Sequence, residues 1–478
     1  MSKKRQRIEP RTLKGFQDFL PEDALLRKTV TASIEAVFRK YGFVPLETPA
    51  LEHLETLLGT GGEETNKELF CLESPEGEPI ALRFDQTVPF ARFMAQYPDK
   101  LKTPFRRYAI GPVWRADKPG PWRFREFTQV DIDIAGSSTV AADAELVAII
   151  SEVMAQLGVD EYAILINSRK LINALLEGCQ IADAEKGKHI LRVIDKLEKV
   201  GLEKIRQELG PGRVDDSGDP IPGVQLDPAT IDQILDFVAI EGSTREEILT
   251  QVEQRLPDSK QTGEAVAEMR ELIDYLNALG VSEKHAPFAP SLARGLDYYT
   301  GPVTEIKILG ANQFGSVGGG GRYYGLVARF LDRPIRCTGI SFGLDRLLGA
   351  LRELGAAPME TAYAQVLIVT MGKVPTGEAF RVASELREAG VATEVFLGKK
   401  KGMGQQLSHA DHYGIPVAVI LGEDELAHGV VAVKDLRAGK EERTHIEDRE
   451  AYRKAGKTGQ TTVTRADLVP TVHDLLSS

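Results

Sequence analysis

Several features are scarce or missing in this sequence, and each absence excludes a class of protein. Only three cysteines occur, Cys71, Cys179 and Cys337, and their wide spacing fits neither a disulfide framework nor a zinc site. No apolar run is long enough to span a bilayer, and the first residues lack the apolar stretch of a secretory signal. We therefore expect a cytoplasmic protein with free thiols, no metal site built from cysteine or histidine and no membrane partner.

Two common nucleotide-binding motifs are also missing. The chain contains no G-x-x-x-x-G-K-[ST] segment, and the glycine run Gly315–Tyr323 does not match the dinucleotide-binding fingerprint. These glycines either let the backbone approach a ligand closely or form a tight hairpin. The net charge of -11 argues against nucleic-acid binding through global charge, although a local basic track can still bind phosphates.

The 478 residues have the composition of an ordinary soluble protein, with 42% hydrophobic and 27% charged residues, and their number predicts two to four domains. After a break near residues 354–361, apolar strands alternate with helices, which predicts a small α/β domain with a largely parallel sheet. Before the break, the hydrophobic pattern predicts a helix over 22–40, an extended segment over 41–49, strands over 100–136, helices over 140–157 and 170–285 with an exposed loop at 210–223, and strands followed by a helix over 291–350.

The strand around residues 127–134 has the clearest alternation in the chain. Thr128, Val130, Ile132 and Ile134 face one way, whereas Phe127, Gln129, Asp131 and Asp133 face the other. The first face predicts burial against a core. The second presents hydrogen-bond acceptors, either to solvent or to a ligand.

Arginines crowd the hairpin that contains this strand. Adenylate transfer from ATP needs charge neutralisation at the α-phosphate and a grip on the γ-phosphate so that pyrophosphate can leave. Arginine suits both roles, because its planar guanidinium binds phosphate oxygens bidentately and keeps its charge. Arg115, Arg123 and the distant Arg346 are the candidates, with carboxylates holding Mg²⁺ between the phosphates.

Five segments of this sequence resemble motifs of the histidyl-tRNA synthetase family, a class II aminoacyl-tRNA synthetase family, and they occur along the chain in the same order as in that family. R-G-L-D-Y-Y from Arg294 and G-G-G-R-Y ending at Tyr323 resemble its two histidine-specific motifs. L-R-F-D-Q-T-V-P-F-A-R-F (residues 82–93) resembles its amino-acid-pocket segment. R-A-D (115–117) followed by W-R-F-R-E-F-T-Q-V-D-I-D-I-A-G (122–136) resembles the second class motif, motif 2, and G-L-D-R (343–346) resembles the third, motif 3. The resemblance covers essentially the whole chain.

The resemblance implies an α+β and α/β multidomain fold. It comprises a class II antiparallel-sheet catalytic domain with a helical insertion, and a C-terminal α/β anticodon-binding domain. On this basis residues 1–168 form the first part of the catalytic domain, with motifs 1 and 2, and 169–285 form the helical insertion. Residues 286–355 form the second part, with the histidine motifs and motif 3, and 362–478 form the anticodon-binding domain.

The family's roles carry over residue by residue. Arg115 would contact the ATP α-phosphate and the histidine carboxylate, Arg346 would hold the γ-phosphate with help from Arg123, and Phe127 would stack on adenine. Arg294 would act on the α-phosphate during adenylation, and Arg115 and Arg294 are the expected catalytic residues. The residues implied in histidine binding are Asp85, Thr87, Arg115, Gln129, Asp133, Arg294, Tyr298 and Tyr299.

The implied activity is that of a histidine–tRNA ligase. ATP and Mg²⁺ would activate L-histidine to histidyl-adenylate, the histidyl group would pass to the 3′ end of tRNA(His), and the enzyme would act as a homodimer. Lys399, Lys400 and Lys401 precede a helix in the C-terminal domain and would suit a phosphate track on tRNA, although a solvated loop explains them equally well.

Two positions depart from the family pattern. Asp117 stands where many members have Glu, and Tyr324 stands where the G-R-Y-D pattern has Asp. One alternative function is a catalytically silent paralogue that senses histidine and regulates a biosynthetic enzyme, but such paralogues usually lack the terminal domain. Another is a class II synthetase for a different amino acid, against which the R-G-L-D-Y-Y segment argues.

Overall fold

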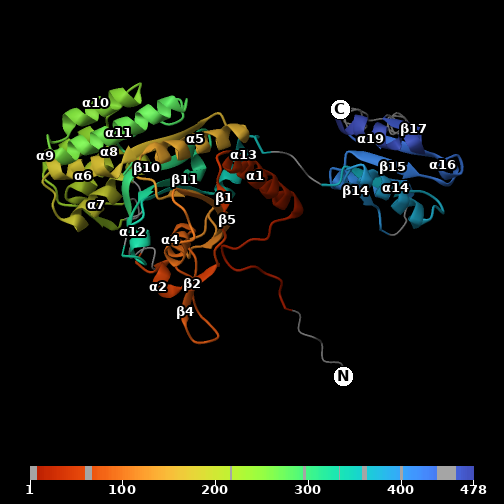
Figure 1. The fold of residues 1–478 in the computed structure, drawn as a ribbon, viewed down its shortest axis with the longest axis horizontal. Helices are drawn as coiled ribbons and strands as arrows, with labels where there is room; N and C mark the ends of the chain where they lie inside the picture. The colour runs from red at the N-terminus through yellow and green to blue at the C-terminus, as the bar shows by residue number, and fades with distance from the viewer. Residues whose placement is uncertain are drawn as a thin grey trace. The chain divides into compact units, whose positions relative to one another are not determined.

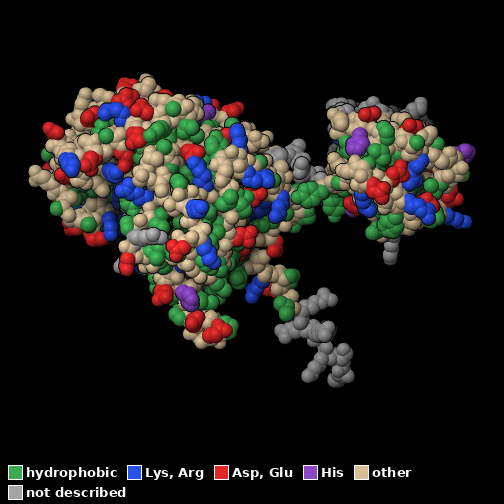
Figure 2. Space-filling view, in the orientation of Figure 1, with side chains coloured by type: hydrophobic (Ala, Val, Ile, Leu, Met, Phe, Trp, Pro, Cys, Tyr) green, Lys and Arg blue, Asp and Glu red, His purple; other side chains and the backbone are tan. Residues whose placement is uncertain are grey.

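The computed structural model describes residues 8–59, 67–215, 218–293, 298–332, 334–357, 363–398, 402–438 and 459–477. The chain divides into two compact units, one formed by residues 1–18 and 30–357 and the other by residues 19–29 and 358–478. In the view of Figure 2, acidic and basic side chains are interspersed over the surface of each unit. None of the described helices is long and apolar enough to cross a membrane.

The first unit is built on a seven-stranded sheet (Figure 1). The edge strand β1 pairs in parallel with β5, and the remaining neighbours are antiparallel. In spatial order the strands are β1 (Val44–Pro45), β5 (Phe105–Trp114), β6 (Glu126–Ala135), β12 (Cys337–Gly343), β11 (Ser316–Tyr323), β10 (Tyr299–Ile308) and β7 (Tyr162–Ser168). The antiparallel-sheet expectation for the catalytic domain is therefore confirmed.

Further elements surround this sheet. A small three-stranded sheet lies next to α2 and consists of β2 (Leu51–His53), β4 (Pro79–Leu82) and β3 (Cys71–Glu73). In the described residues, the helical elements outside the segment 169–285 are α1 (Pro21–Lys40), of which residues 30–40 belong to this unit, α2 (Leu54–Leu57), α4 (Thr87–Gln96), α5 (Ala141–Gln156), the 3-10 turn η1 (Asn312–Phe314), α12 (Gly325–Ala328) and α13 (Leu344–Glu353). The helices predicted over 22–40 and 140–157 correspond to α1 and α5.

A group of helices between β7 and β10 gathers at one side of the unit (Figure 1). Several begin at a polar side chain that accepts a hydrogen bond from the first turn, as Ser168, Asp183, Thr244 and Ser259 do. The helices are α6 (Arg169–Gly178), α7 (Ala184–Ile194), α8 (Leu197–Leu209), α9 (Pro228–Val238), α10 (Arg245–Arg255) and α11 (Lys260–Ala278). The segment 210–223, predicted as a loop, contains an antiparallel pair, β8 (Gly212–Val214) and β9 (Pro220–Pro222).

The second unit contains a five-stranded sheet with apolar helices on both faces. Its order is β14 (Thr393–Val395), β13 (Val366–Thr370), β15 (Val417–Leu421), β16 (Val430–Asp435) and β17 (Gln460–Thr464). The largely parallel sheet expected here is wrong for β16 and β17, because only the pairings among β14, β13 and β15 are parallel. The helical elements are α14 (Thr376–Glu388), α15 (Gly402–His412), α16 (Glu423–Ala427), η2 (Arg465–Asp467) and α19 (Leu468–Ser477).

Candidate active site

Two adjoining cavities lie along the central strands of the seven-stranded sheet. The larger has a volume of ≈ 180 Å³ and the smaller of ≈ 60 Å³. Both are lined by Arg115, Gln129, Gly319 and Ser341. Because these residues belong to both walls, a molecule in one cavity lies directly beside a molecule in the other.

Three arginines from distant segments line the larger cavity. Arg115 donates from Nε to the Phe84 carbonyl at 3.0 Å, which fixes the start of its guanidinium and leaves the terminal nitrogens for a ligand. Arg346, on α13, donates to the Ser316 carbonyl at 2.9 Å. Arg123 is about half exposed and donates twice to Asp117, at 2.8 and 3.1 Å. The three residues predicted for ATP phosphates therefore do line one cavity.

The aromatic residue predicted to stack on adenine also lines this cavity. Phe127 lies on β6, and the guanidinium carbon of Arg115 is 5.3 Å from the centre of its ring. A Cβ added to Gly343 would lie 3.9 Å from the ring, an ordinary contact distance. Flat apolar surface beside arginine charge suits a purine joined to phosphates.

A pair of carboxyl groups at the cavity was not identified from the sequence. Glu68 and Asp117 share a hydrogen bond, and burial together with this neighbour raises the pKa of Glu68 to about 7. Although burial acts in the opposite direction, hydrogen bonds from Glu68 and Arg123 hold the pKa of Asp117 below its usual value. Asp117 therefore carries the negative charge of the pair, between two arginines. Glu68 lies in none of the motifs, so the sequence alone does not indicate its role.

Most of the residues predicted to bind histidine line the smaller cavity. Asp85, Thr87, Arg115, Gln129, Asp133, Tyr298 and Tyr299 all do so. Asp85 accepts a hydrogen bond from the Val88 amide at 3.0 Å through Oδ1, and its other oxygen receives none from the described residues. The Tyr298 and Tyr299 rings meet edge-on, with their centres 4.8 Å apart.

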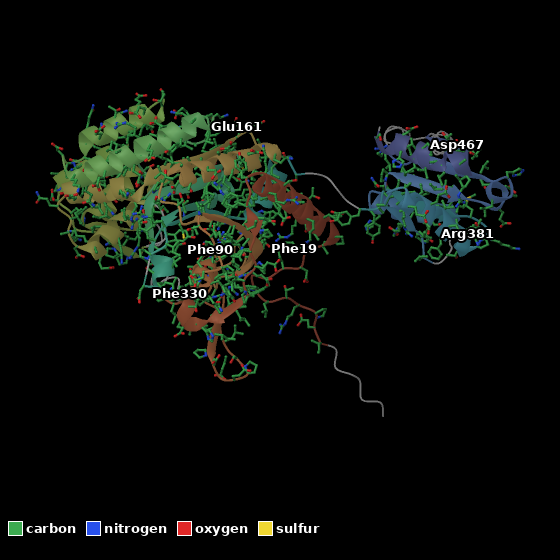
Figure 3. The ribbon with its side chains drawn as sticks, in the orientation of Figure 1. Phe19, Phe90, Glu161, Phe330, Arg381 and Asp467 are labelled. Atoms are coloured by element: carbon green, nitrogen blue, oxygen red, sulfur yellow. The ribbon has the colours of Figure 1, made fainter. Side chains whose placement is uncertain are left out.

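Two residues that line this cavity, Asp131 and Tyr323, and one that pairs with its acid Asp133, Arg107, were not assigned a role from the sequence. The Tyr323 hydroxyl donates to Asp133 Oδ1 at 2.7 Å, and an Arg107 Nη2 atom lies 2.6 Å from Asp133 Oδ2. Arg107 is buried, and Phe90 of α4, labelled in Figure 3, places its ring centre 4.5 Å from the Arg107 guanidinium carbon. The alternation on β6 had indicated Asp131, but no single-sequence pattern pairs it with an arginine on β5.

Burial dominates the ionisation of these acids. It raises the pKa of Asp85 to about 6, against lowering by the Val88 amide, Arg115 and Arg107. It also raises the pKa of Asp133 and Asp131, and that of Tyr298 and Tyr299, so both phenols stay protonated at neutral pH. Protonated phenols can donate to a ring nitrogen, and carboxyl oxygens can accept from a ring N–H. The cavity therefore suits a small ligand with a polar ring.

The glycines of the sequence have a structural reason to be there. Gly318 to Gly321 lie inside β11, and a Cβ at Gly320 would stand 2.0 Å from the Gly339 carbonyl on β12. Gly320 therefore fits neither expectation, because it lies within a strand and lets the backbone of β12 approach closely. Gly318 and Gly319 line the larger cavity, where they leave room for a ligand. A Cβ at Gly339 would lie 2.0 Å from Asp133 Oδ1.

We expect Gly339→Ala to lower histidine binding by about tenfold or more, because the new methyl must displace the Asp133 carboxylate from Tyr323. Isothermal titration calorimetry with L-histidine measures the loss, and the thermal midpoint of the free protein reports any general damage. Gly325→Ala is the matched control, since no atom lies within 4 Å of a Cβ at that position. Unchanged affinity in Gly339→Ala would contradict the role of this carboxylate.

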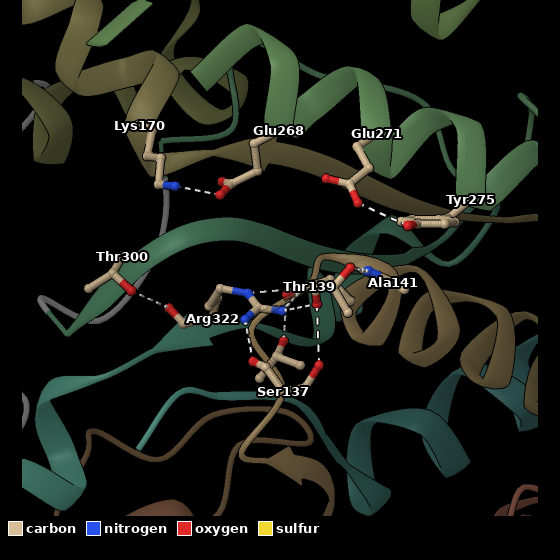
Figure 4. Close-up of polar contacts among 11 residues, drawn as sticks. Ser137, Thr139, Ala141, Lys170, Glu268, Glu271, Tyr275, Thr300 and Arg322 are labelled. Atoms are coloured by element: carbon tan, nitrogen blue, oxygen red, sulfur yellow. Dashed lines mark hydrogen bonds and ion pairs between the residues drawn. The ribbon is translucent and has the colours of Figure 1, made fainter. Parts of the chain in front are cut away.

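The arginine of the G-G-G-R-Y segment, Arg322, lines neither cavity. Its guanidinium instead binds the segment around Ser137 and Thr139 (Figure 4). Arg322 donates from Nε to Asp143 Oδ2 at 3.0 Å, from Nη1 to the Ser137 carbonyl at 2.8 Å and from Nη2 to the Thr139 carbonyl at 2.7 Å. Thr338 donates to the other Asp143 oxygen at 2.7 Å. The pair links β11 to the start of α5 and supports the strand that carries Tyr323.

Some predicted residues fall outside this account. Arg294 and the three lysines 399–401 lie outside the described residues, so their expected roles stay predictions. At the two departing positions, Asp117 pairs with Arg123, and the Tyr324 ring faces Arg336, whose guanidinium carbon is 5.5 Å from its centre. The described cysteines are free thiols.

The antiparallel sheet with arginines from two distant segments along one cavity is the arrangement expected of a class II aminoacyl-tRNA synthetase. Residues 15–347 match the family model for histidyl-tRNA synthetase, and residues 365–455 match the model for an anticodon-binding domain. The chain belongs to the histidyl-tRNA synthetase family.

Individual relatives agree over the full length. The chain is 40% identical to a histidine–tRNA ligase of Paracoccus denitrificans, with 99% of each covered, and 40% identical to one of Caulobacter vibrioides, with 98% and 97% covered. The crystal structure of histidyl-tRNA synthetase from Nostoc sp. PCC 7120 matches with a TM-score of 0.81 at 32% identity, over 98% of this chain and 100% of that one. A structure from Bacillus halodurans titled as an ATP phosphoribosyltransferase regulatory subunit/histidyl-tRNA synthetase matches at 22% identity and shows the fold alone.

Proposed function

We propose that this protein is a histidine–tRNA ligase, which activates L-histidine with ATP and transfers the histidyl group to tRNA(His). The observation that carries the proposal is the wall shared by the two cavities, with Arg115 facing both. Activation requires the amino-acid carboxylate and the α-phosphate to meet, and a single arginine between their sites can hold both. Full-length relatives named histidine–tRNA ligase support the same reading.

In the first step, a histidine carboxylate oxygen attacks the α-phosphorus of ATP in line, and the bond to pyrophosphate breaks. Arg115 would neutralise the charge that develops on the α-phosphate, and Arg346, with help from Arg123, would hold the γ-phosphate. Phe127 would stack on adenine. Arg294 would add charge at the α-phosphate, as the family resemblance implies.

In the second step, a hydroxyl of the terminal adenosine of tRNA attacks the activated carbonyl, and AMP leaves. The match of residues 365–455 to an anticodon-binding domain supports tRNA as the acceptor. We propose Lys399, Lys400 and Lys401 as phosphate contacts on that tRNA. Local lysines would explain how a chain with a net charge of -11 binds a polyanion.

Histidine would lie in the smaller cavity. Asp85 and Thr87 would bind its amino group and Gln129 would lie near its carboxylate, while Asp133 and Tyr299 would contact the imidazole with Tyr298 close by. Polar groups that stay unpaired with the wrong ring discriminate by roughly 10⁴ or more. An acceptor, Asp133, and phenol donors around the ring would therefore set the specificity.

Magnesium would bind with ATP in the larger cavity. Mg²⁺ usually takes one or two protein carboxylates and completes its shell with phosphates and water. Asp117, which is ionised beside Glu68, fits that donor set. When bound, the ion would neutralise charge on the leaving pyrophosphate.

We further propose a cytoplasmic homodimer. The edge strand β1 of the large sheet leaves the Val44 side chain exposed, and Leu51 nearby in sequence is exposed as well. Exposed apolar residues at a sheet edge favour pairing with a second chain. Analytical ultracentrifugation of the purified protein measures the assembly directly.

The decisive test is amino-acid-dependent ATP–pyrophosphate exchange across all twenty amino acids without tRNA. We expect exchange with histidine alone, because the adenylation step is reversible and the smaller cavity selects the ring. A histidine-sensing regulatory paralogue would bind histidine and support no exchange. A synthetase for another amino acid would exchange with that amino acid instead.

A further inference from the structure

The smaller cavity contains more buried acid than the roles assigned so far use. Asp85, Asp131 and Asp133 each expose 3% or less of their surface. Buried carboxylates normally receive hydrogen bonds or face a counter-ion, because an isolated buried charge is costly. Which partner each oxygen has in the protein therefore shows which acid is reserved for a ligand.

Asp133 is already paired within the protein. Its Oδ1 receives the Tyr323 hydroxyl at 2.7 Å, and its Oδ2 lies 2.6 Å from Arg107 Nη2. Although the angle at Oδ2 does not meet hydrogen-bond criteria, an arginine at this distance compensates the carboxylate charge. Asp133 thus needs no ligand cation and can still accept one N–H from a neutral ring.

Asp131 differs from its neighbour. Neither of its oxygens receives a hydrogen bond from the part of the chain that the structure describes, and Arg107 comes no closer than 3.8 Å. The residues opposite it in the sheet are Ala109 on β5 and Ser341 on β12, neither of which brings a cation. The Asp131 carboxylate lines the cavity without a dedicated counter-ion.

Two further acceptor atoms at the same cavity also lack a hydrogen-bond donor among the described residues. Asp85 Oδ2 and Gln129 Oε1 are buried and receive no hydrogen bond from the described residues. Gln129 precedes Asp131 by two residues on β6, so both side chains leave the same face. Burial raises the pKa of Asp131 most, the charges of Arg107 and Arg115 lower it, and those of Asp133 and Asp85 raise it further.

We propose that Asp131 is a histidine-binding residue that, with Asp85 and Gln129, accepts the three N–H groups of the α-ammonium. This inference rests on the proposed function of the cavity. An ammonium group offers three donors and a fixed positive charge, and the three unfilled acceptors include two carboxylates. Asp131 lies between Gln129 and Asp133 on one strand face. Asp133 contacts the ring, and the unfilled Gln129 Oε1 can accept from the ammonium but not from the carboxylate, so Asp131 lies on the ammonium side of the ring.

The test compares L-histidine with 3-(imidazol-4-yl)propionate, which keeps the ring and the carboxylate but lacks the ammonium. Dissociation constants are measured by calorimetry, by competition for the weaker ligand, in wild type, Asp131→Asn and Asp133→Asn. We expect Asp131→Asn to weaken histidine binding roughly 10- to 100-fold, as for a lost hydrogen bond to a charged group, and to leave the analogue within about twofold. Asp133→Asn, the matched control on the same strand face, weakens both ligands by similar factors.

Folding is a separate readout of the same variant. Asp131→Asn removes no hydrogen bond made within the described residues and removes a buried acid, so its thermal midpoint should equal or exceed that of wild type. A fall in stability would mean that Asp131 serves the fold. Equal weakening of both ligands by Asp131→Asn, or no weakening of histidine, would also overturn the inference.

The outcomes separate this inference from the proposed function. A wild-type protein that supports exchange with histidine while Asp131→Asn binds histidine normally contradicts the role of Asp131 alone. A wild-type protein that does not bind histidine contradicts the proposed function and this inference together.

Discussion

Replacement of Arg115 by alanine should lower histidine-dependent ATP–pyrophosphate exchange by about 10²- to 10³-fold. Arg115 faces both cavities, so its loss removes positive charge from the carboxylate and the α-phosphate at once. Removing one preorganised donor at a developing charge typically costs this much in rate. Arg115→Lys should recover only part of the activity, because a lysine cannot bind two oxygens in a fixed plane.

Arg123→Ala is the matched control on the same hairpin. The Arg123 side chain is 51% exposed and pairs with Asp117, so its loss should cost a few-fold, mainly as a higher KM for ATP. Because Arg115 also donates to the Phe84 carbonyl, the thermal midpoint of each variant must accompany the kinetics. Exchange in Arg115→Ala within tenfold of wild type, in a folded protein, would remove Arg115 from the centre of the mechanism.

The residues of the larger cavity could be predicted from the sequence because each sits inside a motif. Arg115, Arg123, Phe127 and Arg346 are separated by up to 231 positions, taken as 346 minus 115, yet they line one cavity. The motifs and their order predict which residues line the cavity. They do not predict which side chains contact one another there. Glu68 lies outside every motif, and only the fold brings it to Asp117.

The polar face of β6 shows where pattern analysis ends. Alternation correctly assigned Gln129, Asp131 and Asp133 to one face, but left open whether that face meets solvent or a ligand. The structure buries all three. What decides the matter is Arg107, which comes from the neighbouring strand and is opposite Asp133 in the register. Cross-strand register depends on the whole sheet, so no local pattern reveals it.

The prediction of a largely parallel sheet was wrong in the second unit because one connection between strands is short. Strands joined by helices are usually parallel, and β13, β14 and β15 follow this rule. The connection from β15 to β16 spans only residues 422–429 and contains the short helix α16. A parallel crossover needs about a dozen residues or more. This connection is shorter, so β16 runs antiparallel to β15.

Replacement of Arg322 by methionine should destabilise the first unit by about 3–5 kcal/mol. Arg322 and Asp143 are both buried, and the guanidinium also holds the Ser137 and Thr139 carbonyls. Removing one partner of a buried pair leaves an uncompensated charge, which is the costly outcome. Chemical denaturation followed by circular dichroism measures the change in the free energy of unfolding of each variant.

A double replacement shows whether the lost charge balance is the cause. Arg322→Met with Asp143→Leu removes both charges, so it should recover much of the stability lost by Arg322→Met alone. Lys170→Met is the matched control, because its pair with Glu268 is partly exposed and should contribute about 1 kcal/mol or less. If the double variant is as unstable as Arg322→Met, the hydrogen bonds to Ser137 and Thr139 matter more than the charge of Asp143. Because Arg322 precedes Tyr323, that result would place the support of the smaller cavity in the backbone of the 137–139 segment.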